Sequence, residues 1–328
     1  MVGTGSIARR HISNLLSMGC EVVVFSQSRS EDFIKVNDCT IKITKDFEAA
    51  LSEHFDGVVI ANQTHLHIDK ALTAAKKNKN IFLEKPISNS INGVYDFLNI
   101  ADNQGLVVET GFMLRLHPNL IWIKKYLQNG GLGDLLYIRG AVGQWLPDWR
   151  PGVDHRLGYG AFKESGGGVI FDLIHELDLC LWFGGQVQEV SCMTTNIDNL
   201  EIETEAIANI NMRFKSGALG QLCLDYVRPL FRRTLEITGT DGVIEWDYAL
   251  GEVHLHTRVD PKVKIIHKVD NSYERNYMFV GEMAHFLKRI QTPSIEPISS
   301  IYDGMNALKL ALACHLSNQN NCKVVNLD

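Results

Sequence analysis

The chain has 328 residues, of which 45% are hydrophobic and 21% are charged, and its formal net charge is −6. This length and composition fit a globular protein of two domains, and the absence of a lysine- or arginine-rich block excludes a nucleic-acid partner. The seven cysteines are scattered and form no CxxC pair, which is typical of free thiols in a reducing compartment. No leader segment or bilayer-spanning run is recognisable, so we expect a cytoplasmic protein with no membrane partner.

Short apolar strands alternate with amphipathic helices in the first third of the chain. We expect strands at residues 21–25, 57–61, 81–83 and 106–108, and helices at residues 6–18, 46–53, 68–77 and 92–103. Asp46 and Ser90 are candidate N-caps. Continuous apolar strands alternating with helices predict a parallel sheet covered on both faces, the doubly wound α/β arrangement.

Strands dominate after about residue 135. They are expected at residues 135–142, 187–195, 206–214, 218–226, 233–239 and 243–247, with helices at residues 171–183, 277–290 and 301–316. Turns such as Lys215-Ser216-Gly217 favour antiparallel pairing. We therefore expect an α/β domain at residues 1–118 and an α+β domain at residues 119–328, an open-faced, mostly antiparallel sheet with flanking helices. The C-terminal helix could pack back on the first domain.

A glycine turn opens the chain. The sequence Gly3-Thr4-Gly5-Ser6-Ile7-Ala8 fits the dinucleotide-binding pattern G-x-G-x-x-G/A, in which a bare backbone meets the pyrophosphate at a helix N-terminus. The alternative is a glycine turn that opens an ordinary helix, but the downstream pattern favours a Rossmann domain in which residues 3–7 bind the cofactor. The strand expected before Gly3 is reduced to Met1-Val2, so we expect a truncated first strand, either from a start codon placed too late or in a genuinely shortened form.

The segment after the second strand bears on cofactor choice. NAD sites usually carry Asp or Glu here to bind the ribose, whereas this chain has Phe25-Ser26-Gln27-Ser28-Arg29. Hydroxyls and a guanidinium suit a 2′-phosphate, so Ser26 and Arg29 favour NADP slightly over NAD. A solvated loop is the alternative.

Polar residues follow three of the parallel strands. The carboxyl ends of such strands form the ligand-binding rim of the sheet, so we expect cofactor contacts from Asn62, Thr64, His67, Glu84, Lys85 and Arg115. Pro86 restricts the backbone of Lys85, and we expect this lysine to hydrogen-bond a substrate hydroxyl near the nicotinamide. The alternative is a Glu-Lys pair that only ends a strand.

A second polar cluster follows three glycines in "GGGVIFDLIHELD". On one helix, Asp172 and His175 would share neighbouring faces, and the glycines would let the first turn approach a ligand closely. Histidine titrates near neutral pH, so His175 is the candidate base and Asp172 a substrate-binding or orienting carboxylate. Polar residues on a solvent-facing helix side are the alternative.

The loop at residues 143–168 is long and rich in functional groups. Trp149, Arg150, Arg156 and Tyr159 are candidates for a substrate wall, with aromatic faces for sugar rings and arginines for a phosphate or carboxylate. An oligomer contact is the alternative. His65 and His67 lack further ligands nearby, so we predict no metal site.

Several of these motifs, in order along nearly the whole chain, resemble the glucose-fructose oxidoreductase / inositol dehydrogenase (Gfo/Idh/MocA) family. They are residues 3–8, the stretch around His67, Glu84-Lys85-Pro86, Gly111-Phe112 with Arg115, His117 and Pro118, and Gly166-Gly167-Gly168 followed by Asp172, His175 and Asp178. The resemblance implies a homodimer or homotetramer and nicotinamide-linked oxidation or reduction of a sugar or cyclitol. It also implies that His175 is the acid/base residue. Many members space the Asp and His four apart rather than three, which leaves the role of Asp172 open.

Three hypotheses follow for the function. The first is an NAD(P)-dependent dehydrogenase in which His175 exchanges the hydroxyl proton and Lys85 polarises that oxygen, acting on a sugar, nucleotide-sugar or cyclitol, with surface-glycan metabolism as a suggested setting. The second is an NAD-dependent glycoside hydrolase of the same fold. The third is a dinucleotide-binding regulator without turnover.

Overall fold

A computed structural model describes residues 1–150, 152–260, 262 and 264–327. The chain forms two compact units. The first consists of Met1–Leu116 with Glu274–Met305, and the second of His117–Tyr273 with Asn306–Asp328. Among the described residues, no helix is both long and apolar enough to cross a membrane.

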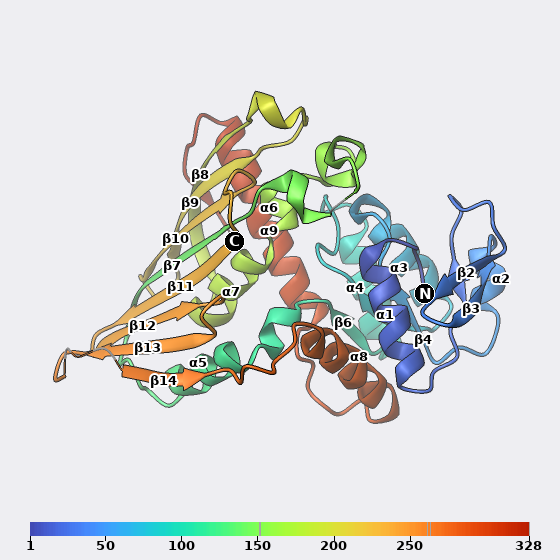
Figure 1. Ribbon diagram of the computed structural model, residues 1–328, viewed down its shortest axis with the longest axis horizontal. Coiled ribbons are helices and arrows are strands. Elements are labelled where there is room, and N and C mark those ends of the chain that lie inside the picture. Colours follow the sequence, from blue (N-terminus) through green and yellow to red (C-terminus); the bar gives the residue numbers. More distant parts are fainter. Residues whose placement is uncertain (151, 261, 263, 328) are drawn as a thin grey trace. The chain divides into compact units, whose positions relative to one another are not determined.

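The first unit is built on a parallel sheet, which confirms the doubly wound α/β prediction (Figure 1). Its strands are β1 (Val24–Phe25), β3 (Cys39–Thr44), β4 (Gly57–Ile60), β5 (Asn80–Leu83) and β6 (Val108–Thr110). Val2 forms parallel bridges to Phe25 and Ile60 and so joins β1 to β4. The strand order is therefore β3-β1-Val2-β4-β5-β6.

The helices α1 (Ser6–Ser17), α2 (Phe47–Leu51), α3 (His67–Lys76) and α4 (Val94–Asn103) occupy the expected stretches. Asp46 caps α2, as predicted, because its carboxylate accepts a hydrogen bond from the Ala49 backbone N–H at 2.9 Å. The predicted cap at Ser90 is wrong. Helix α4 begins after Gly93, and Ser90 instead accepts from the nearby Asn92 N–H.

The sequence did not predict the hairpin that lies between β1 and α2. Strand β2 (Phe33–Val36) pairs antiparallel with β3 around a turn at Asn37, whose φ is 53°. Alternate residues of both strands, such as Ile34 and Ile43, are buried in one cluster with Ile12 of α1. The hairpin therefore covers one side of α1.

The segment Glu274–Met305 interrupts the second unit and completes the first. It contains α8 (Asn276–Gln291) and the start of α9 (Ile301–Gln319). Met283 and Phe286 of α8 share a buried cluster with Leu15, Val59 and Phe82. Burial of such side chains is the main stabilising term in folding, so α8 forms part of the first unit's core.

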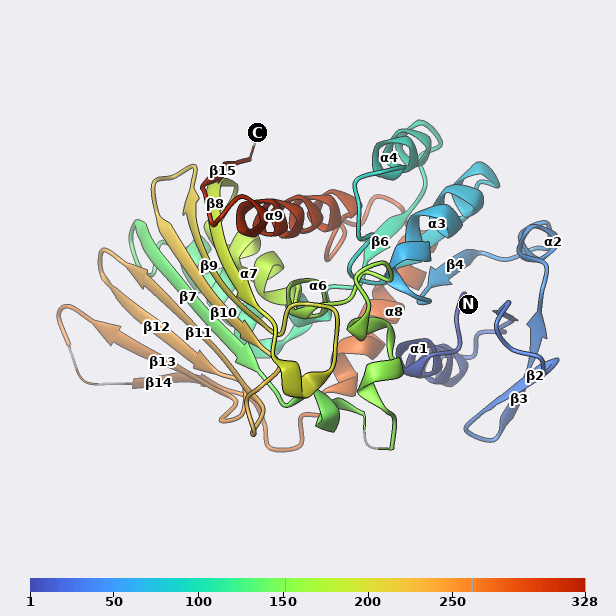
Figure 2. The ribbon, with the colours of Figure 1, turned by 90° about the horizontal axis from the view of Figure 1, so that it is seen from above.

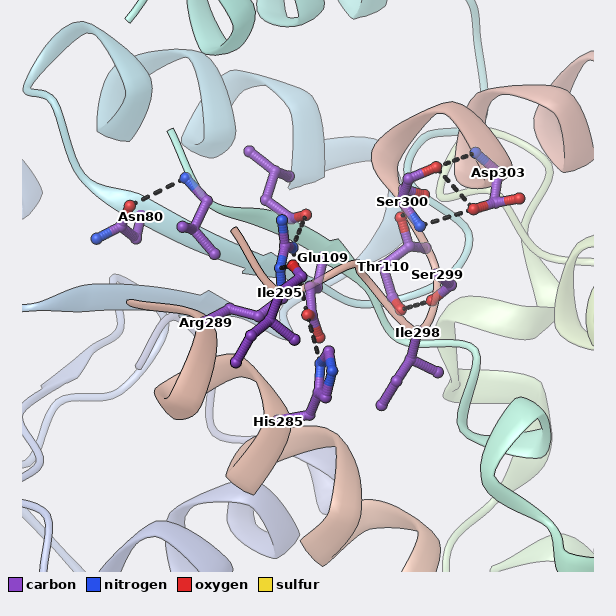
Figure 3. A network of polar contacts seen from close by, with 12 residues as sticks. Asn80, Glu109, Thr110, His285, Arg289, Ile295, Ile298, Ser299, Ser300 and Asp303 are labelled. Carbon is purple, nitrogen blue, oxygen red and sulfur yellow. Dashed lines mark hydrogen bonds and ion pairs between the residues drawn. The ribbon is translucent and has the colours of Figure 1, made fainter. Parts of the chain in front are cut away.

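Polar contacts tie the same segment to β6 (Figure 3). The buried carboxylate of Glu109 accepts hydrogen bonds from His285 Nδ1 at 2.7 Å and from Arg289 Nη1 at 3.3 Å. The backbone N–H of Thr110 donates to Ser299 O at 3.0 Å. These contacts satisfy polar groups at the edge of β6, where the sheet ends.

The second unit is built on a nine-stranded sheet in the order β14-β13-β12-β11-β7-β10-β9-β8-β15. All its neighbours pair antiparallel except β7 and β10, which are parallel. Six strands match the predicted ones: β7 (Leu135–Gly143), β8 (Val187–Thr195), β9 (Ile207–Phe214), β10 (Leu219–Asp225), β11 (Arg232–Gly239) and β12 (Gly242–Asp247). Strands β13 (Glu252–Thr257), β14 (Lys264–Lys268) and β15 (Val325–Asn326) were not predicted.

Helices cover one face of this sheet. Figures 1 and 2 show α6 (Val169–Asp172), α7 (His175–Gly184) and α9 on one side, and no helix of this unit, in the part of the chain that is described, on the other. Helix α5 (Pro118–Gln128) packs beside β14. The mostly antiparallel, open-faced sheet is therefore confirmed. The single helix expected at residues 171–183 is wrong, because a turn at Leu173 and Ile174 separates α6 from α7.

Candidate functional site

The glycine turn has the geometry that dinucleotide binding requires. Gly3 has φ 110°, and a Cβ there would lie 2.7 Å from the Ala61 carbonyl oxygen, so only glycine fits. Gly5 is the N-cap of α1, and a Cβ there would meet nothing within 4 Å. The N–H groups of the first helical turn have no partner within the helix. A pyrophosphate fits this open backbone at the positive end of α1.

Arg29 lies beside the glycine turn. Its Nε donates a hydrogen bond to Thr4 Oγ1 at 3.4 Å, and its half-exposed guanidinium has Glu31 at 3.8 Å. Ser26 is buried, with its hydroxyl 3.3 Å from that of Ser28. The structure thus brings together Thr4 and Arg29, which the sequence proposed separately as cofactor residues.

His67 links the loops that follow β4 and β5. Its Nδ1 lies 2.7 Å from Pro86 O and its Nε2 lies 3.2 Å from Asn62 O. Burial lowers the pKa of His67 and outweighs these carbonyl contacts, so the ring is neutral and donates only one proton. The shorter Nδ1 contact is the better position for that proton. Thr64, in the intervening 3₁₀ turn Thr64–Leu66, is also buried.

Glu84 lies beneath the loop that carries Lys85. Its buried carboxylate is 2.6 Å from His11 Nε2 and accepts the Lys85 backbone N–H at 3.1 Å. Lys85 itself is only partly buried, at the carboxyl end of β5. His11 could not be predicted as a partner of Glu84 because it lies on α1, 73 residues earlier in the chain.

A further buried carboxyl group accompanies Glu84. The pKa of Glu282 on α8 is raised well above its ordinary value, by burial first and then by the negative charges of Glu84 and Glu109. Glu282 therefore holds its proton more tightly than an exposed glutamate does. Nothing in the sequence around Glu282 signals this arrangement.

Arg115 makes its hydrogen bonds within the first unit. It is buried in the 3₁₀ turn Met113–Leu116, and its guanidinium donates to Asp303 Oδ1 at 3.0 Å and to Ile298 O at 3.2 Å. These contacts hold the segment that precedes α9. A direct role of Arg115 in cofactor binding stays a prediction.

In the second unit, Asp172 lies at the centre of a hydrogen-bond cluster. Its two carboxylate oxygens accept from Tyr159 Oη at 2.8 Å and from Tyr226 Oη at 2.7 Å. Burial, followed by the charge of Asp172, raises the pKa of Tyr226 well above its usual value, so this phenol stays a donor. Tyr226 was missed because it lies at the end of β10, far from Asp172 in sequence.

His175 is the first residue of α7 and is buried. Because the turn at Leu173 and Ile174 separates it from α6, Asp172 and His175 do not share one helix as expected. The glycines before α6 also make close contacts within the protein, while close approach of a ligand to this turn stays a prediction. A Cβ on Gly167 would lie 2.3 Å from Gly160 O, and one on Gly168 would lie 2.3 Å from Glu205 Oε1, so protein atoms occupy the space beside them.

Glu205 is a titratable group that the sequence did not reveal. It is buried, and its carboxylate accepts the Ile170 backbone N–H at 3.1 Å. Burial raises its pKa to about 7, with a smaller contribution from the charge of Asp172. Its proton is therefore exchangeable near neutral pH, beside the cluster around Asp172.

Some of the substrate-wall residues predicted in the loop at residues 143–168 lie in the cluster around Asp172. Trp149, in the 3₁₀ turn Leu146–Trp149, packs edge-on against Tyr226 with ring centroids 5.2 Å apart, and the Arg150 guanidinium lies 5.6 Å from the Tyr159 ring centroid. Arg156 is engaged differently. Its guanidinium bonds Asp154 and Glu201 at the surface, both at 3.0 Å or less.

Metal ligation has no support within the described ranges, where no group of three or more His, Cys, Asp or Glu side chains could hold an ion.

Comparison with known families matches both parts of the chain. The model of an oxidoreductase family with an NAD-binding Rossmann fold matches residues 1–112, and that of the GFO/IDH/MocA C-terminal domain matches residues 121–245. The chain belongs to the Gfo/Idh/MocA family. The resemblance seen in its motifs is thereby confirmed, as is the NAD-binding character of its Rossmann domain.

Among curated members of the Gfo/Idh/MocA family, myo-inositol 2-dehydrogenase of Thermotoga maritima is 24% identical over 97% of this chain and 95% of its own length. A 2,7-anhydro-N-acetylneuraminate hydratase of Mediterraneibacter gnavus is 25% identical over 69% of this chain, and the match spans 60% of the hydratase.

Solved structures support the same fold. Levoglucosan dehydrogenase in complex with NADH superposes with a TM-score of 0.87 over 100% of this chain and 98% of that one, at 19% identity. This likeness extends the Gfo/Idh/MocA architecture over the full length of the chain.

Proposed function

We propose that this protein is an NAD(P)-dependent dehydrogenase that interconverts a secondary hydroxyl and a ketone on a sugar or cyclitol. The observation that carries the proposal is the nearly full-length match to a myo-inositol 2-dehydrogenase, with Lys85 and His175 both present. Levoglucosan dehydrogenase, a structural neighbour, is known in complex with NADH and levoglucosan, so two relatives act on or bind compact polyols.

A nicotinamide dinucleotide held at the glycine turn would supply the acceptor for the hydride of the carbinol carbon. His175 takes the hydroxyl proton as the C–O bond becomes a carbonyl, and returns it in the reverse direction. The Lys85 ammonium donates a hydrogen bond to the same oxygen and stabilises the negative charge that develops there. Atoms balance, because the alcohol loses one hydride to the cofactor and one proton to His175.

The cluster around Asp172 provides the polyol-binding surface in this proposal. Aromatic faces such as that of Trp149 suit the apolar side of a sugar ring, while Arg150 and the phenol of Tyr159 offer donors to hydroxyls. Both Asp172 oxygens already accept strong hydrogen bonds from tyrosines. We therefore assign Asp172 a positioning role rather than proton transfer.

We also propose that NADP is accepted alongside NAD. No carboxylate stands at the end of β1, and Arg29 lies within hydrogen-bond reach of Thr4 in the glycine turn. Arg29→Ala should then raise the Kd of NADP much more than that of NAD, since only NADP carries a 2′-phosphate. Equal changes in both dissociation constants would show that Arg29 does not read the ribose.

The decisive experiment is a screen of cyclitols and monosaccharides with NAD⁺ and NADP⁺, followed by the absorbance of reduced nicotinamide. Lys85→Ala and His175→Asn should each lower kcat about 10²- to 10⁴-fold, the usual contribution of a general acid/base group. Lys77→Ala, which removes an exposed lysine at the end of α3, is the matched control and should leave kcat unchanged. Full turnover by Lys85→Ala would refute the proposal.

A redox-neutral reaction is the second candidate, because the hydratase of Mediterraneibacter gnavus is among the relatives. Such an enzyme would consume anhydro-sugars or glycosides without net formation of reduced nicotinamide. Product analysis in the absence of added cofactor separates the two candidates. Dinucleotide binding without any turnover would instead indicate a regulator.

A further inference from the structure

The side chains beneath Lys85 form a fixed support. His11 lies on α1, directly after the glycine turn, and is completely buried, with Phe82 and Phe279 ring centroids 5.4 and 6.0 Å from its own. Its Nε2 lies 2.6 Å from Glu84 Oε1. The packed rings leave the imidazole little freedom to rotate, so the contact to Glu84 is well defined.

The second oxygen of Glu84 holds the backbone of Lys85. Oε2 accepts the Lys85 N–H at 3.1 Å. Gly111, at the end of β6, closes the carboxylate from another side, since a Cβ there would lie 3.0 Å from Glu84 Cδ and Oε2. Both oxygens are thus engaged, and the group is confined by two neighbouring strands and one helix.

The hydrogen-bond geometry of His11 indicates which ring nitrogen donates to Glu84. His11 Nδ1 is buried and has no hydrogen-bond partner among the residues that the structure describes. A protonated Nδ1 would leave a buried donor unsatisfied, which costs about 1–3 kcal/mol. The proton that His11 donates to the Glu84 carboxylate is therefore on Nε2.

The residue after Lys85 is held as well. His67 Nδ1 lies 2.7 Å from Pro86 O, and this ring is also buried. The Lys85-Pro86 unit is therefore fixed at its first N–H by Glu84 and at its last carbonyl by His67. A flexible side chain such as lysine reaches a defined target most readily when its own backbone does not move.

We infer that His11 and Glu84 are positioning residues for Lys85. They connect the helix that receives the cofactor pyrophosphate to the backbone of the lysine that polarises the substrate oxygen. This inference rests on the proposed function of Lys85. Because a misplacement of about 1 Å can cost about 100-fold in rate, loss of the His11–Glu84 contact should lower kcat while leaving the substrate and cofactor sites formed.

The test uses the full chain with His11→Phe, which keeps a ring of similar size but has no donor, and Glu84→Gln. Each should lower kcat about 10- to 100-fold, with KM and the Kd of the dinucleotide within about twofold of the unaltered protein. His11→Gln, whose amide can donate to Glu84, should recover part of the loss. Asn14→Ala, a buried polar residue on the same helix that contacts Asn276 instead, is the control for lost stability.

A double-mutant cycle separates positioning from general damage. Adding His11→Phe to Lys85→Ala should cause no further loss of kcat, because residues that act as one unit are non-additive. If the kcat losses of the two substitutions multiply, or if His11→Phe keeps full turnover, the inference is overturned. The proposed function still stands in that case, provided that Lys85→Ala alone has a lowered kcat.

A second measurement does not depend on turnover. Amide hydrogen exchange at Lys85 should accelerate in His11→Phe relative to Asn14→Ala, because the carboxylate that accepts its N–H is no longer held in place by His11. Unchanged exchange at Lys85 would also overturn the inference. Faster exchange in a protein for which no dehydrogenase substrate is found would support the positioning contact and reject only the proposed function.

Discussion

Glu205 offers a direct test of how burial controls charge in the second unit. Its pKa is raised to about 7 from an ordinary value of 4.5, mainly by burial. The folded protein therefore holds a proton that the unfolded chain releases in this range. The resulting contribution to stability is fully present below pH 4.5, falls as the pH rises, and is lost above about pH 7. The difference of 7 − 4.5 pKa units corresponds to about 3 kcal/mol.

Glu205→Gln removes the titration but keeps an oxygen that can accept the Ile170 N–H. Between pH 4.5 and about pH 8, the free energy of unfolding of this variant should rise by about 3 kcal/mol relative to the unaltered protein. Urea unfolding followed by tryptophan fluorescence is the assay. All five tryptophans lie in the second unit, so the signal reports the unit that contains Glu205.

Other groups in this unit titrate in the opposite sense. Burial lowers the pKa of both His117 and His315 to about 4, so the stability that depends on their neutral forms is lost as the pH falls from 6.5 through 4. Both histidines are present in the Glu205→Gln variant and in the unaltered protein, so their contributions cancel when the two free energies of unfolding are subtracted. Glu203→Gln, an exposed substitution two residues away, is the control. Its free energy of unfolding should differ from that of the unaltered protein by an amount that does not change with pH. A flat difference for Glu205→Gln as well would refute the reasoning.

Three further changes test other features. Tyr226→Phe should destabilise the second unit by about 1.5–3 kcal/mol, because it removes a buried donor to Asp172; tryptophan fluorescence would reveal a smaller effect if the contact is weak. Arg233→Met should cost about 3–5 kcal/mol by leaving Glu176 buried without its partner at 2.6 Å, and Arg233→Met with Glu176→Leu should recover most of that loss. Gly5→Ala should keep the thermal stability, since its φ of −68° suits alanine, yet weaken dinucleotide binding at least about tenfold as measured by calorimetry, because the Cβ takes the space needed by the pyrophosphate.

The sequence was most informative where local pattern and burial coincide. Helix α1 and strands β4 and β8 follow the apolar periodicity that predicted them. Strands β13 and β14 were missed because the sheet edge carries polar residues such as His254 and Lys268, which blur the alternation. The break between α6 and α7 was missed because Leu173 and Ile174 are apolar and carry no helix-breaking signal.

The site residues divide in a similar way. Lys85 and His175 could be named from their neighbours in sequence. His11, Tyr226 and Glu205 could not, because each acts through a partner brought close only by the fold, such as Glu84 for His11. A single sequence contains no signal for such pairs, since burial of a polar residue is visible only once its neighbours are placed.

The discontinuity of the first unit has a consequence for synthesis on the ribosome. Its core includes Met283 and Phe286 of α8, which are made only after residues 117–273 of the second unit have been translated. Until then, Leu15, Val59 and Phe82 lack part of their apolar cover, and exposed surface of this kind attracts chaperones and promotes aggregation. At that stage the second unit lacks only the short strand β15 and most of α9. We therefore expect it to fold first, even though the first unit begins earlier in the chain. A nascent chain stalled before Glu274 should therefore be cleaved by protease within residues 1–116 while the later segment resists.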